Sequence, residues 1–290
     1  MKAENLSFKT KFMNTFRKVL RGPVTEQWLK SAFSRSSLYP KIVPPEYLYK
    51  HGTWRDFEEG GVHYRLDISK VVDHYVYFGM EDYAFKKELN VIQNAKVILD
   101  IGANIGISFS WFVRHNPNVR IIAFEPHPET AKRALEQIER NNFKNVELIQ
   151  VALGSEEAEL SIYEVEDHNP GMNRVSYEKL ERPSRKVPVK RLDDVLASLQ
   201  ATNPDFIKMD VEGFEYFVLL GATKTLRSCP VLFIEVNDQY LTANGFSASQ
   251  MIRFLEEKGY NSIRRSDTDE SLRSDSQLKN CHFDIIAKKI

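Results

Sequence analysis

Apolar runs and amphipathic segments alternate along the chain from about residue 96 onward. The apolar runs lie at 96–101, 120–126, 145–153, 205–213 and 230–237. Each run is short and nearly continuous, which is typical of strands buried on both faces of a sheet. The segments between them carry apolar residues at helical spacing and lie at 105–115, 127–142, 214–226 and 247–259. This alternation predicts an α/β fold in which helices cover both faces of a parallel sheet.

Two segments depart from this alternation. Residues 156–190 have the pattern of an inserted hairpin, because two strand-like segments flank the polar loop "DHNPGMNRVSYEK" at 167–179. At the C-terminus, the strand-like segments 260–266 and 281–289 have no helix between them. Strands joined in this way pair antiparallel, so the sheet is expected to end in an antiparallel strand.

Residues 1–60 differ from the rest and are expected to form a separate extension ahead of a main domain at 61–290. Phe8, Phe12, Phe16 and Leu20 recur every four residues among Lys and Arg, which predicts a basic amphipathic helix. Packing of this Phe stripe on the main domain is favoured over contact with a partner or with an anionic membrane face. The Pro- and Tyr-rich segment 39–52 follows as a connector.

Composition narrows the class of protein. Among 290 residues, 40 basic side chains balance 40 acidic ones, so no overall field favours a nucleic acid partner. Two cysteines, Cys229 and Cys281, are too few for a disulfide framework and are expected to be free. No apolar run is long enough to span a membrane, and basic residues interrupt the N-terminus where a secretory signal would lie. We therefore expect a cytoplasmic protein, with peripheral membrane contact as an option.

The stretch "VILDIGANIGISFSWF" (97–112) contains the first candidate chemistry, a tight turn between a strand and a helix. Dinucleotide-binding folds typically have the motif G-x-G-x-x-G at this turn. Here Ala103 and Asn104 follow Gly102 ahead of Gly106, so the middle glycine of the motif is absent. Asp100 ends the strand, where its carboxylate would repel a pyrophosphate and attract the ammonium and sulfonium of S-adenosylmethionine. The turn therefore favours S-adenosylmethionine, with an NAD(P)-dependent oxidoreductase or epimerase as the alternative.

The next two strands add further candidates for a nucleoside site. Glu125 ends the second strand and can accept hydrogen bonds from both ribose hydroxyls, although its spacing would suit NAD as well. Pro126 and His127 follow it directly, and we expect them to line the adenosine site. Ala152 and Leu153 end the third strand, where they form either an apolar wall for adenine or ordinary core.

Carboxylates also end the fourth and fifth strands. An aliphatic hydroxyl needs its proton removed as it is alkylated, and either Asp210 or Glu212 could serve as the general base. Alternatively, Asp210, Glu235 and Asn237 could bind a divalent ion that lowers the pKa of the acceptor, which is the less favoured arrangement. Glu212 could instead cap the following helix.

The loop at 167–179 is a candidate for the acceptor site. It is long and polar, and it leaves the sheet near the end where the cofactor residues gather. Asn173, Arg174 and Ser176 could offer hydrogen bonds to a polyhydroxylated substrate. A solvated hairpin tip is an equally good interpretation.

Six segments appear in an order that resembles a known family. They are "VILDIGANIGISFSWF", "AFEPHPE", "VALG", "KRLDDVL", "DFIKMDVEGFEYFVLLGA" and "VLFIEV". Together they resemble the motif series of FkbM-type S-adenosylmethionine-dependent methyltransferases, over roughly residues 75–240.

The resemblance implies a Rossmann-like, class I methyltransferase sheet of seven strands with an antiparallel last strand. It also implies O-methylation of a hydroxyl on a sugar, glycolipid or secondary metabolite. The residues that carry over as cofactor contacts are Asp100, Gly102, Asn104, Gly106 and Glu125. A non-catalytic binding module with the same fold is the remaining alternative.

Overall fold

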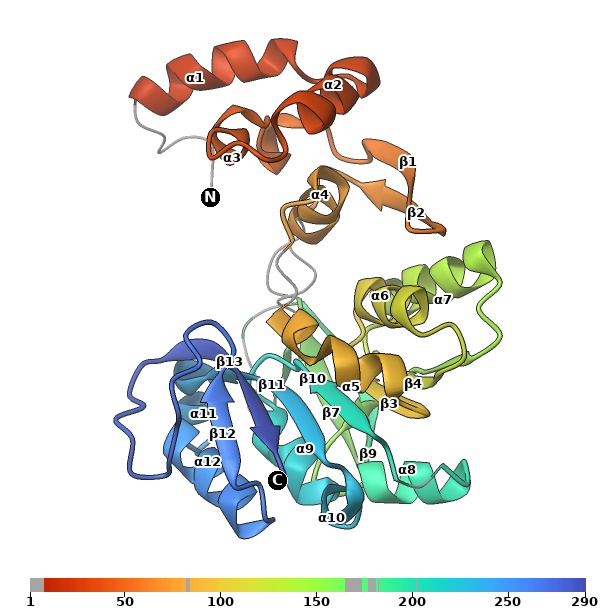
Figure 1. Cartoon of the computed structure of the whole chain (residues 1–290), viewed down its shortest axis with the longest axis vertical. Helices are drawn as coiled ribbons and strands as arrows, with labels where there is room; N and C mark the ends of the chain where they lie inside the picture. Colours follow the sequence, from red (N-terminus) through yellow and green to blue (C-terminus); the bar gives the residue numbers. More distant parts are fainter. Residues whose placement is uncertain (1–7, 82–83, 165–173, 177–180, 182, 202) are drawn as a thin grey trace. The chain divides into compact units, whose positions relative to one another are not determined.

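The computed structural model describes residues 8–81, 84–164, 174–176, 181, 183–201 and 203–290. Contacts between residues divide the chain into two compact units, with the main break between residues 82 and 83 (Figure 1). The boundary expected after residue 60 falls inside the first of these units. Residues 60 and 61 form the turn of a hairpin whose two strands pair from Trp54↔Asp67 to Glu59↔Val62, so both strands stay in one unit.

The first unit contains helices and this hairpin. The helices are α1 (Phe8–Val19), α2 (Pro23–Phe33), α3 (Tyr39–Ile42), the 3-10 turn η2 (Glu46–Leu48) and α4 (Val71–Phe78). The hairpin strands are β1 (Trp54–Glu59) and β2 (Val62–Asp67). The expected basic helix is thus present as α1, and the expected connector contains α3 and η2.

A buried ion pair joins α2 to the hairpin. Glu26 is fully buried and accepts hydrogen bonds from the Arg55 guanidinium, from Nε at 2.7 Å and from Nη2 at 3.0 Å. Tyr77 on α4 donates a third hydrogen bond to Glu26, at 3.2 Å. A buried carboxylate needs such partners, so this cluster fixes three elements of the unit together.

The second unit is built on the expected sheet of seven strands. Its strands are β3 (Val97–Ile101), β4 (Arg120–Phe124), β5 (Val146–Ile149), β10 (Phe206–Met209), β11 (Val231–Asn237), β12 (Ser262–Arg265) and β13 (His282–Lys288). Their order is β12-β13-β11-β10-β3-β4-β5. The five strands from β11 to β5 pair in parallel, whereas β13 is antiparallel to both β11 and β12. The predicted α/β class and the antiparallel C-terminal strand are confirmed.

Helices cover both faces of this sheet. They are η3 (Ala84–Glu88), α5 (Leu89–Asn94), α6 (Ile107–His115), α7 (Pro128–Asn141), α8 (Leu192–Ser198), α9 (Glu215–Gly221), α10 (Thr225–Ser228), α11 (Asp238–Ala243) and α12 (Ala248–Glu257). Alternate residues of β3 lie in different apolar clusters: Ile98 packs with Phe109 and Phe112, whereas Leu99 packs with Val218 and others. This alternation explains why the strands read as continuous apolar runs.

The inserted segment forms part of a second, smaller sheet. Its strands are β6 (Ala152–Leu153), β7 (Ala158–Tyr163), β8 (Arg174–Ser176) and β9 (Ser184–Lys190), in the order β6-β9-β7-β8. The expected hairpin is present, since β7 and β9 pair antiparallel. The expected third strand at 145–153 is wrong in one respect, because the chain turns at residues 150–151 and Ala152 leaves the main sheet to pair with Val189.

The helix predicted at 214–226 is also interrupted. It ends at Gly221, and a second helix begins at Thr225. The carboxylate of Asp193 accepts hydrogen bonds from the backbone N–H groups of Lys224 and Thr225, at 2.8 and 2.9 Å. These bonds satisfy the first N–H groups of the new helix and favour a fresh start there.

Candidate active site

The turn after β3 is held between the ends of the two neighbouring strands. The N–H groups of Gly102 and Ala103 both donate to the carbonyl oxygen of Phe124 at the end of β4. Gly102 has a φ of 79°, and a Cβ at this position would overlap the carbonyl oxygen of Asp210, which follows β10. Only glycine allows both this backbone conformation and this close approach.

Glu125 fixes the far end of the same turn. One carboxylate oxygen accepts from the N–H of Asn104 at 2.9 Å, and the other accepts from the N–H of His127 at 2.9 Å and the hydroxyl of Thr130 at 2.7 Å. The side chain is buried, and this burial raises its pKa while the three hydrogen bonds lower it. Glu125, which is predicted to hold the ribose, therefore connects the turn to the start of α7 through hydrogen bonds.

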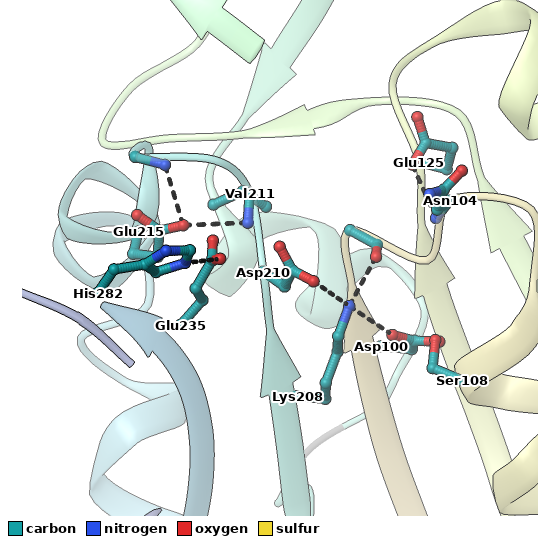
Figure 2. Close-up of polar contacts among 12 residues, drawn as sticks. Asp100, Asn104, Ser108, Glu125, Lys208, Asp210, Val211, Glu215, Glu235 and His282 are labelled. Atoms are coloured by element: carbon teal, nitrogen blue, oxygen red, sulfur yellow. Dashed lines mark hydrogen bonds and ion pairs between the residues drawn. The ribbon is translucent and has the colours of Figure 1, made fainter. Parts of the chain in front are cut away.

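Lys208 occupies the centre of the site, and sequence reasoning missed it. Its Nζ donates to the carbonyl oxygen of Gly102 at 2.8 Å and lies 3.7 Å from Oδ1 of Asp100 and 3.4 Å from Oδ2 of Asp210 (Figure 2). Burial lowers the pKa of Lys208, but Asp210 and Asp100 raise it by more, and the net shift is upward. A lysine inside an apolar strand needs such partners, and "DFIKMD" is the signal that could have revealed it.

Lys208 offsets the negative charge of Asp100, on which the prediction of the cofactor is based. The carboxylate is completely buried, its Oδ2 accepts from Ser108 Oγ at 2.5 Å, and Lys208 lies on its other side. Burial raises the pKa of Asp100, while Lys208 and Ser108 lower it. Asp100 is thus not an isolated negative charge, and its sign alone does not discriminate between S-adenosylmethionine and a dinucleotide.

An acidic cluster lies at the ends of β10 and β11, beside Lys208. Carboxylate oxygens of Asp210, Glu212 and Glu235 lie within 4.8 Å of one another. Burial and then the charges of Glu235 and Asp210 raise the pKa of Glu212 to about 9. Glu235 also has a raised pKa, mainly through burial, although its Oε1 lies 2.8 Å from Nε2 of His282. Glu212 therefore keeps its proton near neutral pH, and the cluster could instead hold a hard divalent cation.

Two of the three predicted metal ligands, Asp210 and Glu235, belong to this cluster, and Glu212 joins them. The Oδ1 of Asn237 accepts from the N–H of Tyr240 at 3.4 Å and caps α11, and its role as a ligand stays a prediction. Glu212 is not the helix cap that was the alternative, because Phe214 is the N-cap of α9 and no side chain of the described residues caps that helix. The Oε1 of Glu215 accepts from the N–H groups of Val211 and Gly213 before the helix, both at 3.1 Å.

Two residues of the site adopt backbone conformations that are uncommon outside glycine. Asn104 has a φ of 49° and Glu212 a φ of 55°. Such conformations cost free energy and cluster at functional sites, where the surrounding structure enforces them. Both residues lie beside glycines of the site, Gly102 and Gly106 near the former and Gly213 directly after the latter.

The other predicted residues divide into two groups. Pro126 and His127 follow β4, and Nε2 of His127 lies 3.4 Å from Glu164, the residue after β7, so the inserted sheet reaches this side of the site. Ala152 and Leu153 are buried in apolar clusters, and their role as a wall for adenine stays a prediction.

The predicted acceptor residues remain largely untested. Asn173 lies outside the described residues. Arg174 and Ser176 belong to β8, at the edge of the small sheet. Their contact with an acceptor also stays a prediction.

Comparison with known proteins identifies the family. The family model described as "Methyltransferase FkbM domain" matches residues 100–262, which is more than half of the chain. The chain belongs to the FkbM methyltransferase family. The matched range begins at Asp100 and includes Glu125, Lys208 and the acidic cluster, whereas residues 1–82 of the first unit lie before it.

Curated relatives are similar over part of their length. The 2-O-methyltransferase NoeI of Sinorhizobium fredii is 27% identical over 50% of this chain and 65% of its own. The hexuronic acid methyltransferase AglP of Haloferax volcanii is 30% identical over 49% of this chain and 56% of its own. Among solved structures, precorrin-6y C5,15-methyltransferase of Geobacter metallireducens is 17% identical with a TM-score of 0.42, over 71% of this chain and 87% of that one. The chain thus matches less than two thirds of the length of either curated relative.

Proposed function

We propose that the protein transfers a methyl group from S-adenosylmethionine to a hydroxyl of a saccharide. The observation that carries this proposal is the position of Lys208, which contacts the turn after β3 and the carboxylate of Asp210 at once. In open parallel sheets, ligands bind at the carboxyl ends of strands, where these two features meet. The proposed cofactor site and the proposed acceptor base are therefore adjacent in a chain of a methyltransferase family.

The residues around the turn suit a cofactor with amino and hydroxyl donors. Asp100 Oδ1 and Asn104 Oδ1 are both buried and accept no hydrogen bond from the described part of the chain. Buried acceptors without partners are rare, and donors from a bound molecule would satisfy them. We assign the methionine end to Asp100 and Gly102 and the ribose to Glu125 and Asn104. When bound, S-adenosylmethionine supplies an electrophilic methyl group on a sulfonium that leaves as a thioether.

Asp210 is the group that we assign as general base. Its side chain is 43% exposed, so an acceptor hydroxyl can reach it, and the Lys208 ammonium fixes its position at 3.4 Å. Glu212 is less suited to this role, because its pKa of about 9 keeps it protonated at neutral pH. A protonated carboxyl can instead donate a hydrogen bond to a neighbouring acceptor oxygen. A positioned base contributes about 10²–10⁴ to the rate.

A divalent cation is a second way to activate the same hydroxyl. Asp210, Glu212 and Glu235 would supply the oxygen ligands, and the ion would lower the pKa of the acceptor. Glu235 Oε2 is buried without a hydrogen-bond partner, which fits such a ligand. We favour the base without a metal, because Lys208 already supplies a cation 3.4 Å from Asp210.

The proposed acceptor class rests on the relatives and on the polarity of the site. The names of NoeI and AglP specify 2-O-methylation and hexuronic acid methylation. Several carboxylates around Asp210 offer acceptors for the hydroxyls of a sugar. A glycolipid or a hydroxylated secondary metabolite would present the same group.

Binding and transfer are tested separately. Calorimetric titration with S-adenosylmethionine, S-adenosylhomocysteine and NAD should give heat for the first two only. Methyl-labelled S-adenosylmethionine is then incubated with neutral sugars, hexuronic acids and oligosaccharides, and label in an O-methyl group identifies the acceptor. Binding of NAD alone would contradict the cofactor, and binding without transfer to any acceptor would favour a non-catalytic module.

A further inference from the structure

The segment from α1 to the start of α3 exposes a concentration of large apolar side chains. Ten such side chains are exposed among the described residues, and six of them lie between residues 12 and 38. These six are Phe12 (57% exposed), Phe16 (60%), Val19 (78%), Val24 (83%), Trp28 (53%) and Leu38 (54%). Phe12 and Phe16 are therefore not buried within their own unit, and the expected packing of the Phe stripe on the main domain stays a prediction. Exposed apolar groups gathered in this way mark interaction surfaces.

The exposed side chains of α1 share one face of the helix. Phe12, Phe16 and Val19 follow one another at spacings of four and three, which places them on one side. Asn14 lies on another side, where it is buried and donates to the Tyr47 hydroxyl at 3.2 Å. The helix is thus anchored to its unit through one face and presents a second, apolar face outward.

Helix α2 repeats this arrangement. Val24 and Trp28 are four residues apart and exposed, whereas Glu26 and Leu29 are buried within the unit. The buried carboxylate of Glu26, on the inner face of α2, already has Arg55 as its hydrogen-bond partner. The outer, apolar face of α2 is therefore not part of the core of its own unit.

The charge around these helices is strongly positive. Residues 8–50 contain nine Lys or Arg and two acidic residues, although the whole chain has no net charge. Of the two acidic residues, Glu26 is buried in its ion pair and Glu46 is half-buried. The exposed basic side chains are Lys11, Lys18, Arg21, Arg35, Lys41 and Lys50. A surface that joins Phe and Trp with exposed positive charge is complementary to an anionic lipid headgroup layer.

We propose that α1 and α2 bind the surface of an anionic membrane, with Phe12, Phe16 and Trp28 entering the interface. No helix among the described residues is long and apolar enough to cross a bilayer. The mode of binding is therefore interfacial, with the helices parallel to the surface. This surface lies outside the family match, so the proposal does not depend on the proposed methyl transfer.

The test is sedimentation of the full chain with vesicles. We expect the protein to sediment with vesicles of phosphatidylcholine mixed with phosphatidylglycerol, and to stay in solution with phosphatidylcholine alone. High salt should release it, because screening weakens the attraction between the basic residues and the lipids. The fluorescence of Trp28 should shift to shorter wavelength with the anionic vesicles, and the shift should be lost in Trp28→Phe.

Matched variants locate the binding surface. The double variant Phe12→Ser/Phe16→Ser should lower the partition to anionic vesicles by about tenfold or more, since each loss removes apolar burial. Leu135→Ser, which changes an exposed apolar residue of α7, should bind as the wild type does. Lys11→Glu/Lys18→Glu should bind weakly, whereas Lys132→Glu/Lys144→Glu on the second unit should not change binding. Unchanged thermal unfolding of each variant shows that it is folded.

Three results would overturn the proposal. One is failure to sediment with either kind of vesicle, which would leave a protein partner as the occupant of the surface. Another is equal binding to neutral and anionic vesicles. The third is binding that Phe12→Ser/Phe16→Ser and Leu135→Ser affect to the same extent.

Discussion

The Nζ of Lys208 lies 3.4 Å from Oδ2 of Asp210 and donates a hydrogen bond to the carbonyl oxygen of Gly102. One buried ammonium therefore connects the turn that we assign to the cofactor with the carboxylate that we assign to the acceptor. A displacement that proceeds in line needs its two reactants held at a fixed distance and angle. Lys208 is thus a positioning residue, since it acts through Gly102 and Asp210.

Replacement of Lys208 should affect stability as well as turnover. Lys208→Met leaves the buried carboxylate of Asp100 without its cation, and breaking a buried pair in this way costs about 3–5 kcal/mol. Asp210 is 43% exposed and recovers part of its solvation, so we expect the lower end of this range. Urea unfolding measures the loss, and Lys144→Met serves as the control at an exposed position. Equal unfolding free energies for the two variants would contradict the proposed role.

Asp210→Asn should separate chemistry from cofactor binding. The amide keeps the shape of the side chain but cannot take a proton, so kcat should fall by about 10² or more while the Kd for S-adenosylmethionine stays within a few-fold. Asp194→Asn removes a half-exposed carboxylate of α8 and should leave kcat unchanged. Wild-type turnover by Asp210→Asn would exclude Asp210 both as base and as metal ligand.

Glu125→Ala should weaken cofactor binding. The variant removes the proposed partner of the ribose hydroxyls, and each lost hydrogen bond to a charged group costs about 1.5–3 kcal/mol. The same change frees the N–H groups of Asn104 and His127, so some loss of stability is expected as well. Calorimetric titration measures the affinity, and Glu147→Ala at an exposed position of β5 is the control. An unchanged Kd would remove Glu125 from the site.

The acidic cluster predicts how stability depends on pH. The pKa of Glu212 rises from its ordinary value of 4.5 to about 9 in the fold, mainly through burial and the charges of Glu235 and Asp210. Between these two pH values the folded chain binds more protons than the unfolded chain, so the free energy of unfolding should fall as pH rises. Glu212→Gln should reduce this slope, and Glu157→Gln, at an exposed position, should not. Unfolding curves in a chelator across this range test the prediction, and identical slopes would contradict it.

A divalent cation would also change how the free energy of unfolding depends on pH. If Asp210, Glu212 and Glu235 bind an ion, Mg²⁺ or Mn²⁺ should stabilise the protein increasingly at high pH, where the carboxylates are ionised. If no metal binds, the free energy of unfolding should be the same in chelator and in added cation. Turnover measured after chelation gives an independent result, because loss of activity would favour the metal.

Much of the fold follows from patterns that the sequence displays directly. The strands β3, β4, β10 and β11 appear in the sequence as apolar runs because both of their faces are covered. The amphipathic pattern at 247–259 likewise corresponds to α12, whose N-cap Ser247 accepts from the N–H of Gln250. The breaks at residues 150–151 and after Gly221 could not be read in the same way. They arise from contacts distant in sequence, the pairing of Ala152 with Val189 and the hydrogen bonds of Asp193 to the start of α10.

The site was predictable only in part for a similar reason. Strand ends located Asp100, Glu125, Asp210 and Glu235, since parallel strands bring their carboxyl ends to one edge. Lys208 lies within a strand, and its partners come from both that strand and its neighbour, so only the assembled sheet shows its role. The capping bond of Asn237 and the bond from the N–H of Val211 to Glu215 likewise depend on turn geometry and not on spacing alone.

The most direct test is the transfer of labelled methyl from S-adenosylmethionine to one saccharide by the wild-type protein and by Asp210→Asn. Both proteins must first be shown to bind S-adenosylmethionine equally. We predict label in an O-methyl group of the saccharide with the wild type, and at least about 10²-fold slower labelling with the variant. Equal labelling by both proteins would contradict the assignment of Asp210. The absence of S-adenosylmethionine binding by the wild type would contradict the proposed function itself.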